Sequence, residues 1–504
     1  MEDSVRTWII IFSFAMIMVS FLIGLWAKKK ADSVQSFFGA TALFGPVTVG
    51  LSSTAAVASA FAVVGVPGLI YATGNAMSFW MLSSACFAIS YFILGKKIRA
   101  MAEVAPIASL GDISDLRFNN NKAIKGIMSI ILFIGCIAYL SSQIKAGSEF
   151  FGHLVGWSPV VAGFVIFGIL TVYTALSGEV GGLLTQAFQG AVMAFAGIIL
   201  IIGFFMVTGG MQGVLEVTAS AGEISAGGVT KIFSPDIMNA WGVLPGTVAM
   251  AWMVIPILGL VGQPTVLCRM YAIKDPTEMP KLTLYATLSH MAVAVMAVLA
   301  GYGALYLVGK GLIAPLTSPD LAVFVFSDYL GIWAQLFVYA AVLAGAMSSA
   351  SMFLSLSAGF ISRDLPSAFG FKPSPEKQLT ISRITIFALG ILAVLFSLSS
   401  GEMVAILGTF GWGTLMSATF PVFIIGLLWK KASSEGVLSG LAVALVLNIV
   451  CMVLLRSGFK FWGSLPWYFN VITAAILTTV IVSLFTTGST ANELDERVEA
   501  VMDL

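Results

Sequence analysis

Charged residues are scarce in this chain. Of its 504 residues only 10% are Asp, Glu, Lys or Arg, 59% are hydrophobic, and the mean hydropathy is +1.00. Soluble domains carry about 25% charged residues, so the composition excludes an ordinary soluble protein and predicts one that crosses the membrane many times. A formal net charge of +1 also lacks the basic excess that nucleic-acid binding needs, and we expect no nucleic-acid partner.

Residues that build metal and catalytic sites are equally few. The chain has two histidines and four cysteines, with no H-E-x-x-H and no C-x-x-C spacing, which argues against a zinc centre and a disulfide framework. A glycine-rich phosphate loop with a lysine is missing as well. We therefore expect a protein with no catalytic residues rather than an enzyme.

Long apolar runs dominate what remains. A membrane-spanning helix needs about 20 mostly apolar residues, and thirteen stretches qualify. They lie at roughly 8–27, 43–71, 77–95, 124–147, 159–177, 181–208, 239–270, 281–309, 330–361, 380–399, 403–429, 435–455 and 467–487. Lysines follow the first run in place of a small-residue cleavage site, so we expect it to be a retained helix rather than a signal peptide.

The basic residues favour one orientation. With the N-terminus outside, the cytoplasmic connections and the C-terminal tail hold 19 of the 25 lysines and arginines and the other side holds 6, as the positive-inside rule requires. We expect an odd number of spans in the cell membrane, with the N-terminus outside and the C-terminus in the cytoplasm.

The expected organisation is one integral membrane domain over residues 1–504. Its parts are an extra N-terminal helix at 8–27, a core at 43–429, two C-terminal helices at 435–487 and a short acidic tail at 488–504 that we expect to be frayed. The segment SLGDISDLRF in the loop 96–123 predicts a short helix on the membrane face, and 210–237 reads as a polar loop outside.

The stretch from Gly45 to Gly68 differs from the other apolar runs. Pro46 and Pro67 bracket it, and its middle holds small residues and hydroxyls. In a membrane, backbone leaves the helix only where it is buried in protein or lines a wet cavity, so we expect an unwound turn that directs carbonyl oxygens at a cation. A second interrupted run extends from Pro245 to Pro264. Two broken segments in corresponding halves point to a transporter's binding site, with spans two to six repeated as seven to eleven.

The ninth span carries a cluster of hydroxyls. Ser348, Ser349 and Ser351 lie within four positions, and the carbonyl of Gly345, one turn earlier, points toward them. Oxygen ligands of this kind suit a hard cation such as sodium. Small residues and serines also mark close helix packing in membranes, and the pattern by itself leaves both interpretations open.

Ionisable groups are nearly absent from the middle of the spans. We expect no buried Arg or Lys, and His290 is the only mid-span candidate for the relay that a proton-coupled carrier needs. A lone histidine is more often a hydrogen-bonded structural residue. Four glutamines are the more useful polar groups, since each could hold a solute or bridge two helices: Gln143, Gln186, Gln189 and Gln263.

An ordered set of motifs runs through the chain. It consists of GPVTVGLSSTAAVASAFAVVGVPG, SLGDISDL-R, TQAFQG, GLVGQP-VLCRM, LAGAMSSASM followed by ISRDL, and GWGTLMSATFPVFIIGLLW followed by EGVLSGL. Together these motifs resemble the sodium/solute symporter family, which includes bacterial proline and pantothenate carriers and the sodium/glucose carriers, over nearly the whole chain. The resemblance implies an all-α polytopic membrane protein of about 13 transmembrane helices. Its core would be the five-plus-five inverted repeat of the amino-acid/polyamine/organocation superfamily, with discontinuous helices.

The resemblance also implies a sodium site. Carried over by position, its ligands are the backbone oxygens of Ala55, Ala58 and Gly345 and the hydroxyls of Ser348 and Ser349. These positions fall in the two stretches already chosen on physical grounds, so the sodium interpretation is favoured over helix packing. Sodium is thus the expected co-transported ion.

Four positions depart from the family pattern, and they bear on the expected number of sodium ions and on the expected solute. Val57 stands where the proline branch has an Asp, and Gln186 stands where many members have an acid that serves a second sodium in some of them, so we predict one sodium per cycle. Pro256 and Leu260 replace a Trp and a Tyr of the proline branch, so we do not expect proline as the solute. The candidate lining residues are Val57, Ser59, Phe61, Gln143 and Gln263. A small neutral, zwitterionic or monocarboxylate solute fits best, with any carboxylate resting on helix N-terminal amides.

The expected function is sodium-coupled symport of a small organic solute into the cell by alternating access. The expected partners are that solute and the lipid bilayer, with no obligate protein partner. Two alternatives stay open. One is a proton-coupled carrier of the same fold, which would use His290, and the other is a non-transporting membrane sensor or scaffold, which the short tail argues against.

Overall fold

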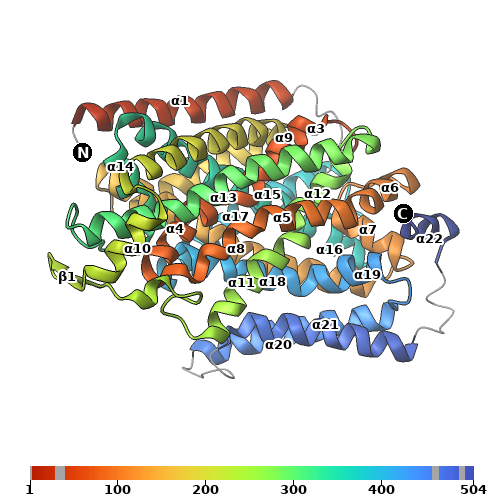
Figure 1. Ribbon diagram of the computed structural model, residues 1–504. Helices are drawn as coiled ribbons and strands as arrows, with labels where there is room; N and C mark the ends of the chain where they lie inside the picture. Colours follow the sequence, from red (N-terminus) through yellow and green to blue (C-terminus); the bar gives the residue numbers. More distant parts are fainter. Residues whose placement is uncertain (1–2, 29–39, 457–464, 487–493) are drawn as a thin grey trace.

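The computed structural model describes residues 3–28, 40–456, 465–486 and 494–504. Long helices dominate it (Figure 1), and a two-stranded antiparallel hairpin of β1 (Glu223–Ala226) and β2 (Val229–Ile232) is the one sheet among these residues. The helices up to the middle of the chain are α1 (Asp3–Lys28), α3 (Pro46–Ala60), α4 (Val66–Thr73), α5 (Ser83–Ser90), α6 (Lys96–Val104), α7 (Leu110–Arg117), α8 (Lys122–Val155), α9 (Pro159–Thr208) and α10 (Met211–Ser220). Those that follow are α11 (Gly246–Val261), α12 (Pro264–Ala272), α13 (Met279–Gly309), α14 (Ala322–Leu330), α15 (Ile332–Gly359), α16 (Leu365–Ala368), α17 (Pro375–Ser400), α18 (Val404–Thr419), α19 (Gly426–Leu428), α20 (Ser434–Arg456), α21 (Trp467–Thr486) and α22 (Glu496–Met502).

Eleven helices of the described residues are long and apolar enough to cross a membrane. Two features explain why this number is lower than the thirteen predicted spans. The predicted spans 43–71 and 77–95 both fall in one continuous helical stretch, Pro46–Val104. Within it, Figure 1 shows α3 and α4 running one way and α5 and α6 returning. The apolar helix Pro159–Ile169 is shorter than a full span, and α9 bends sharply after it at Gly178 (φ 55°, ψ −173°). The membrane-spanning character is confirmed, and the exact count stays a prediction.

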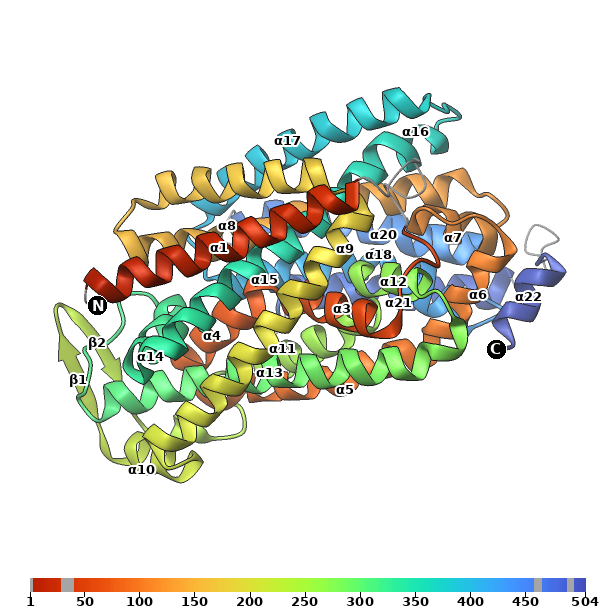
Figure 2. The ribbon, with the colours of Figure 1, turned by 90° about the horizontal axis from the view of Figure 1, so that it is seen from above.

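The two chain termini lie at opposite ends of the bundle in both views (Figures 1 and 2). One end carries α6, α7, α16 and α22 and is named here the α7 end. The opposite end carries α10, α14 and the hairpin and is named the α10 end. Termini at opposite ends agree with an odd number of crossings.

The short helix and the tail lie at the α7 end. The predicted short helix is confirmed as α7, which begins with a capping box between Ser109 and Asp112. The tail was expected to be frayed, and this is wrong for residues 494–504. Lys97 Nζ donates to the Met502 carbonyl at 2.5 Å, and Lys430 pairs with Asp503 at 2.6 Å, because the acidic tail meets basic side chains there. Residues 488–493 lie outside the described residues.

Helix α3 lies in the interior of the bundle, where it contacts α9, α13 and α15. Every residue from Ser52 to Ala60 is buried. Its alanines, serines and glycines make this position possible, since small side chains let neighbouring helices approach closely in a membrane protein. The central helix is therefore the one that the sequence singled out as interrupted.

A buried carboxyl group holds part of the α10 end together. Asp320 precedes α14 and is 1% exposed. The backbone N–H of Val404, at the start of α18, donates to its Oδ2 at 3.1 Å. The other oxygen, Oδ1, has no hydrogen-bond partner among the described residues and lies beside the backbone of Gly68. Burial raises the pKa of Asp320 from 3.8 to about 7.

This carboxyl group makes stability depend on pH. A carboxyl pKa raised on folding contributes stability that is fully present below the unfolded value and is lost as pH rises through about 7, by up to about 4 kcal/mol. Asp320→Asn is therefore expected to flatten the fall in thermal midpoint between pH 5 and pH 8. Glu223→Gln, at an exposed position of the same end, is the control and should leave the pH profile as it is. An Asp320→Asn profile identical to that of the unmodified protein would contradict this role.

Candidate functional site

The unwound turn predicted in the first broken run is centred on Ser59. Its backbone adopts φ 42° and ψ 176° inside α3, a conformation that costs of order 1–3 kcal/mol for a residue other than glycine. Two side chains of α8 hold the turn. The Ser59 hydroxyl lies 2.8 Å from the Tyr139 hydroxyl, and the backbone N–H freed at Ala60 donates to Gln143 Oε1 at 3.0 Å. The polar groups exposed by the break are thus hydrogen-bonded to side chains of α8 rather than to the backbone of α3.

The hydroxyl cluster of α15 meets the carbonyl oxygens of α3 just before this break. Ser348 Oγ donates to the Ala55 carbonyl at 2.7 Å, across 293 positions of sequence, and lies 3.1 Å from the Gly345 carbonyl. Ser349 Oγ lies 3.4 Å from the Ala55 carbonyl and donates to the Ala56 carbonyl at 3.0 Å. We name these oxygens the α3–α15 oxygen cluster.

Four of the five predicted sodium ligands belong to this cluster. The fifth, Ala58, is fully buried on the same helix, but its carbonyl accepts the N–H of Phe61 in the turn. The carbonyl oxygen of Ala56, which the sequence did not suggest, accepts a hydrogen bond from the Ser349 hydroxyl instead. The set consists of neutral carbonyl and hydroxyl oxygens, the ligands that a hard monovalent cation prefers.

Close contact between the two helices depends on Gly345. A Cβ atom at this position would lie 2.9 Å from the Ser59 carbonyl carbon and 3.1 Å from the Ala60 nitrogen. Both are backbone atoms of the break, so a larger residue would push α3 and α15 apart. The glycine therefore places the turn and the serines within reach of one ion.

The second interrupted run breaks between α11 and α12. Helix α11 ends at Val261, and Gln263 with extended backbone (φ −62°, ψ 123°) precedes Pro264 at the first position of α12. The amide nitrogen of Gln263 is buried and has no hydrogen-bond partner among the described residues. The Thr419 hydroxyl, likewise unpartnered there, lies beside Gly262. The second break thus presents polar groups that the described protein leaves free.

Aromatic rings connect the two breaks. Phe61 lies 5.1 Å from both Trp80 and Trp412, measured between ring centroids. Trp412 also stacks on Tyr139 at 6.1 Å, and its ring lies 3.5 Å from where a Cβ at Gly259 would be. An apolar surface of this kind, with polar groups at two sides, is typical of a small-molecule site.

The structure places the predicted lining residues at different parts of the site. It brings Ser59, Phe61 and Gln143 together at the first break, and it places Gln263 at the second. Val57 is fully buried on α3, and its apolar side chain makes no polar contact with the others. Sequence reasoning missed Tyr139, Trp80 and Trp412. Only Tyr139 gave a usable signal, since it precedes Gln143 by four positions and so shares its helix face.

The expectation of no buried Arg or Lys is wrong. Arg269 is 1% exposed, and Lys125 and Arg117 are 4% and 3% exposed. The sequence places all three beside the ends of apolar runs, on the expected cytoplasmic side. The structure places them in α7, α8 and α12, where they pack into the bundle and find partners. Arg269 bonds Glu179 and Gln186. Arg117 donates to the Gly426 carbonyl at 2.5 Å, and burial lowers its pKa to about 10.

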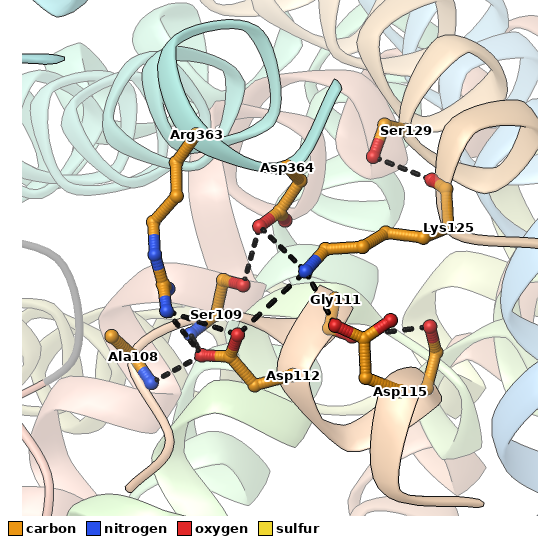
Figure 3. Close-up of polar contacts among 10 residues, drawn as sticks. Ala108, Ser109, Gly111, Asp112, Asp115, Lys125, Ser129, Arg363 and Asp364 are labelled. Carbon is orange, nitrogen blue, oxygen red and sulfur yellow. Dashed lines mark hydrogen bonds and ion pairs between the residues drawn. The ribbon is translucent and has the colours of Figure 1, made fainter. Parts of the chain in front are cut away.

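Two basic side chains at the α7 end join two motifs far apart in the chain (Figure 3). Arg363 contacts both carboxylate oxygens of Asp112 at 2.9 and 2.8 Å, and Lys125 pairs with Asp115 at 2.7 Å. Asp364 accepts from the Ser109 hydroxyl at 2.8 Å. Burial raises the pKa of Asp115, and the bond from Lys125 opposes this. We name these six residues the α7 cluster, which ties α7 to α8 and to the end of α15.

The other glutamine and histidine candidates are explained by packing. Gln189 donates to the Ser20 hydroxyl of α1 at 3.3 Å, so it bridges two helices. His290 lies 3.0 Å from the Ser83 hydroxyl and stacks on Phe87 at 5.3 Å, as expected of a structural histidine. Proton coupling through His290 stays an untested alternative.

Two helices broken in their middle, with an oxygen cluster beside the first break, define the core of an ion-coupled transporter with an inverted repeat. The chain belongs to the sodium:solute symporter family, whose family model matches residues 37–444. It is therefore a multi-pass membrane protein that couples sodium to the transport of a solute.

Individual relatives support the same assignment. The chain is 29% identical to the osmoregulated proline transporter OpuE of Bacillus subtilis over 430 residues, which is 84% of each chain. It is 25% identical to the sodium/pantothenate symporter of Escherichia coli over 452 residues, 87% of this chain and 89% of the relative. Among solved structures, a Na+-coupled sialic acid symporter in a substrate-bound outward-open state superposes with a TM-score of 0.73 at 18% identity, covering 95% of this chain and 98% of the other. The nucleobase-cation-symport-1 family transporter Mhp1 gives a TM-score of 0.51 at 15% identity, covering 92% and 97%. The predicted inverted-repeat fold with discontinuous helices is confirmed.

Proposed function

We propose that this symporter carries a small solute with a carboxylate and an apolar body, bound between the two helix breaks. The observation that carries the proposal is the unpartnered, buried amide nitrogen of Gln263 at the second break. An N–H group donates and cannot accept, so it favours an acceptor on the solute. The Thr419 hydroxyl, which lies beside Gly262 at the same break, can also donate, and a carboxylate accepts hydrogen bonds from both kinds of group.

The rings between the breaks suit the rest of the solute. Phe61, Trp80 and Trp412 form a buried aromatic surface that favours an apolar or aromatic body. Sugars need many polar partners, and this surface supplies few. The relatives named for proline and pantothenate make these two compounds worth including in a screen, although Pro256 and Leu260 depart from the proline branch.

We further propose that one sodium ion binds the α3–α15 oxygen cluster, with Ala58 as an additional carbonyl ligand. The ion would turn the hydroxyl lone pairs of Ser348 and Ser349 toward itself and tie α3 to α15, which shapes the adjoining turn at Ser59. Coupling between ion and solute is reciprocal and typically amounts to 1–3 kcal/mol. A sodium ion carried with a monoanion moves no net charge, whereas one carried with a zwitterion gains about 2.3 kcal/mol per 100 mV.

The direction of transport follows from a proposed orientation. The positive-inside rule favours the α7 end in the cytoplasm and the α10 end outside. The α7 cluster then lies on the cytoplasmic path from the site and joins the segments that must separate for release to that side. Asp320 and Gly68 lie on the opposite path.

A ligand screen tests the proposed solute class. Purified protein is heated with small monocarboxylates, amino acids including proline, and the matching neutral amides, each in sodium chloride and in choline chloride. Carboxylates are expected to raise the thermal midpoint only with sodium, and the best compound should then exchange in a counterflow assay. Stabilisation by the neutral amides as strong as by the acids would contradict the proposal.

Two glutamine variants localise the solute. Gln263→Leu should weaken the best carboxylate by about tenfold or more, because a hydrogen bond to a charged group contributes about 1.5–3 kcal/mol, and it should leave stabilisation by sodium alone unchanged. Gln189→Leu removes a buried amide that bonds α1 instead and should leave solute affinity as it is. Equal effects of the two variants would place the carboxylate elsewhere.

A further inference from the structure

A basic cavity opens at the α7 end, where α7 and α8 meet the segment that leads from α16 to α17. Its volume of about 330 Å³ lies within the roughly 300–1,000 Å³ of ligand clefts. The polar side chains of its lining are those of Lys122, Lys125, Lys372, Asp115, Asn120 and Ser367. Three lysines against one aspartate give this lining a net charge of +2. We name it the lysine cavity.

Two of the three lysines carry a charge that the protein leaves uncompensated. Lys125 pairs with Asp115 at 2.7 Å inside the α7 cluster (Figure 3). Lys122 and Lys372 are exposed and form no ion pair with a carboxylate among the described residues. The Nζ atom of Lys122 lies 3.8 Å from where a Cβ atom of Gly370 would be, so its amine reaches the segment that carries Lys372.

The neutral groups of the lysine cavity suit an oxyanion. The Asn120 amide and the Ser367 hydroxyl both line the cavity, and each can donate a hydrogen bond. Lysine ammonium groups bind phosphate as point charges. Two ammonium groups with two neutral donors therefore favour a phosphate group over a neutral ligand.

Two phenylalanines project from the rim of the lysine cavity. Phe369 and Phe371, 71% and 70% exposed, flank Gly370, which also lines the cavity. The Phe371 N–H donates to the Pro366 carbonyl at 2.8 Å and so fixes the turn that carries both rings. Exposed aromatic side chains next to lysines are typical of a segment that lies at a membrane surface.

The helix that follows this turn faces lipid. Figure 2 shows α17 along the outer edge of the bundle, with α16 beside its start. Ile384, Phe387 and Leu395 are exposed on α17, and in a membrane such side chains contact acyl chains, which are as apolar as they are. The lysine cavity thus lies where the headgroup of a neighbouring lipid would be.

We propose that the lysine cavity binds the phosphate of an anionic phospholipid from the cytoplasmic leaflet. The two uncompensated lysines hold the phosphate, the amide and the hydroxyl donate to its oxygens, and the two phenylalanines contact the acyl chains. Basic pockets between helices on the cytoplasmic side of membrane proteins bind headgroups in this way. Because Asp115 and Lys125 also belong to the α7 cluster, the bound headgroup braces the contact of α7 and α8 with α16. The inference uses the proposed orientation of the chain only for the choice of leaflet.

Thermal stabilisation in a neutral detergent tests the proposal. Purified protein is titrated with phosphatidylglycerol, with phosphatidylcholine of the same acyl chains, and with inorganic phosphate at matched ionic strength. We expect phosphatidylglycerol to raise the thermal midpoint and the other two to leave it unchanged. Equal stabilisation by phosphatidylcholine would overturn the proposal, because net negative charge would not be needed. Equal stabilisation by inorganic phosphate would overturn the assignment of a lipid.

Two matched double variants separate the cavity from the general attraction of a basic surface. Lys122→Gln with Lys372→Gln should lower the apparent affinity for phosphatidylglycerol by about tenfold or more. Lys274→Gln with Lys281→Gln removes the same charge from exposed lysines outside the cavity and should leave the affinity unchanged. Equal losses in the two variants would overturn the proposal.

A third variant tests the lipid rather than the phosphate. Phe369→Ser with Phe371→Ser keeps both lysines and should weaken phosphatidylglycerol by about fivefold or more, since the rings no longer cover apolar surface. Native mass spectrometry, which counts the phosphatidylglycerol molecules retained by each protein, provides a second readout. Unchanged retention in this variant would contradict the contact with acyl chains. These measurements need neither sodium nor a solute, so their outcome is independent of the proposed function.

Discussion

Replacing Ser348 and Ser349 together by alanine is expected to raise the half-saturating sodium concentration for transport by at least about tenfold. The two hydroxyls are the side-chain oxygens of the α3–α15 oxygen cluster, where they lie 2.7 to 3.4 Å from backbone oxygens of α3. Without them an ion would keep only carbonyl ligands, and desolvating it would be poorly compensated. Sodium titration of solute uptake in proteoliposomes measures the shift, and sodium-dependent thermal stabilisation measures it without a solute.

A serine elsewhere in the same helix provides the control. Ser357→Ala removes a buried hydroxyl further along α15, away from the carbonyls of α3, and should leave sodium dependence unchanged. If the double variant kept the sodium dependence of the unmodified protein, the ion would bind elsewhere and the cluster would be a helix contact only.

Gly345→Ala is expected to reduce sodium-coupled uptake by more than about tenfold. The added methyl group would meet the Ser59 and Ala60 backbone at 2.9 to 3.1 Å, and backbone atoms in a packed interior cannot move aside independently. The turn would shift away from α15, and both the ion ligands and the partners Tyr139 and Gln143 would lose their geometry. Initial rates of uptake at saturating sodium give the size of the loss.

A second glycine separates this effect from helix propensity. Alanine stabilises a helix by about 1 kcal/mol relative to glycine, so propensity alone predicts a gain. Gly163→Ala, in α9, would bring a methyl group no closer than 3.5 Å to its neighbours and should retain transport. Full activity in Gly345→Ala would show that α3 and α15 need not meet so closely.

The two segments of the proposed sodium site could be chosen from the sequence because the sequence carries their two requirements locally. A helix break needs small residues and proline, which the run from Gly45 to Gly68 supplies, and hydroxyl ligands need adjacent serines, which α15 supplies. At Ala58 the carbonyl accepts the N–H of Phe61 in the turn, and the Ala56 carbonyl, which the sequence did not suggest, accepts the Ser349 hydroxyl. Which carbonyls face an ion depends on the exact place of the break at Ser59, and composition does not fix that place.

The pairing of the buried charges could not be predicted from the sequence. Arg269 and Glu179 each lie near the end of an apolar run, and the sequence gives no reason to pair them. Their ion pair joins α9 to α12 across 90 positions of sequence. The same is true of the α7 cluster, where ISRD of the ninth span meets SLGDISDLR across about half the chain. A pattern within one segment holds no information on such pairings.

The sequence by itself determined that this chain is a membrane protein and that two of its helices break, and it predicted hydroxyl rather than carboxylate ligands for the expected ion. These properties are local, since hydropathy, proline and serine act on their own segment. Only the tertiary structure decided that the first break meets the serines of α15, that three aromatic rings lie between the breaks, and that Arg269 pairs with Glu179. Each of these depends on contacts between residues distant in the chain, which the packing of the whole bundle selects.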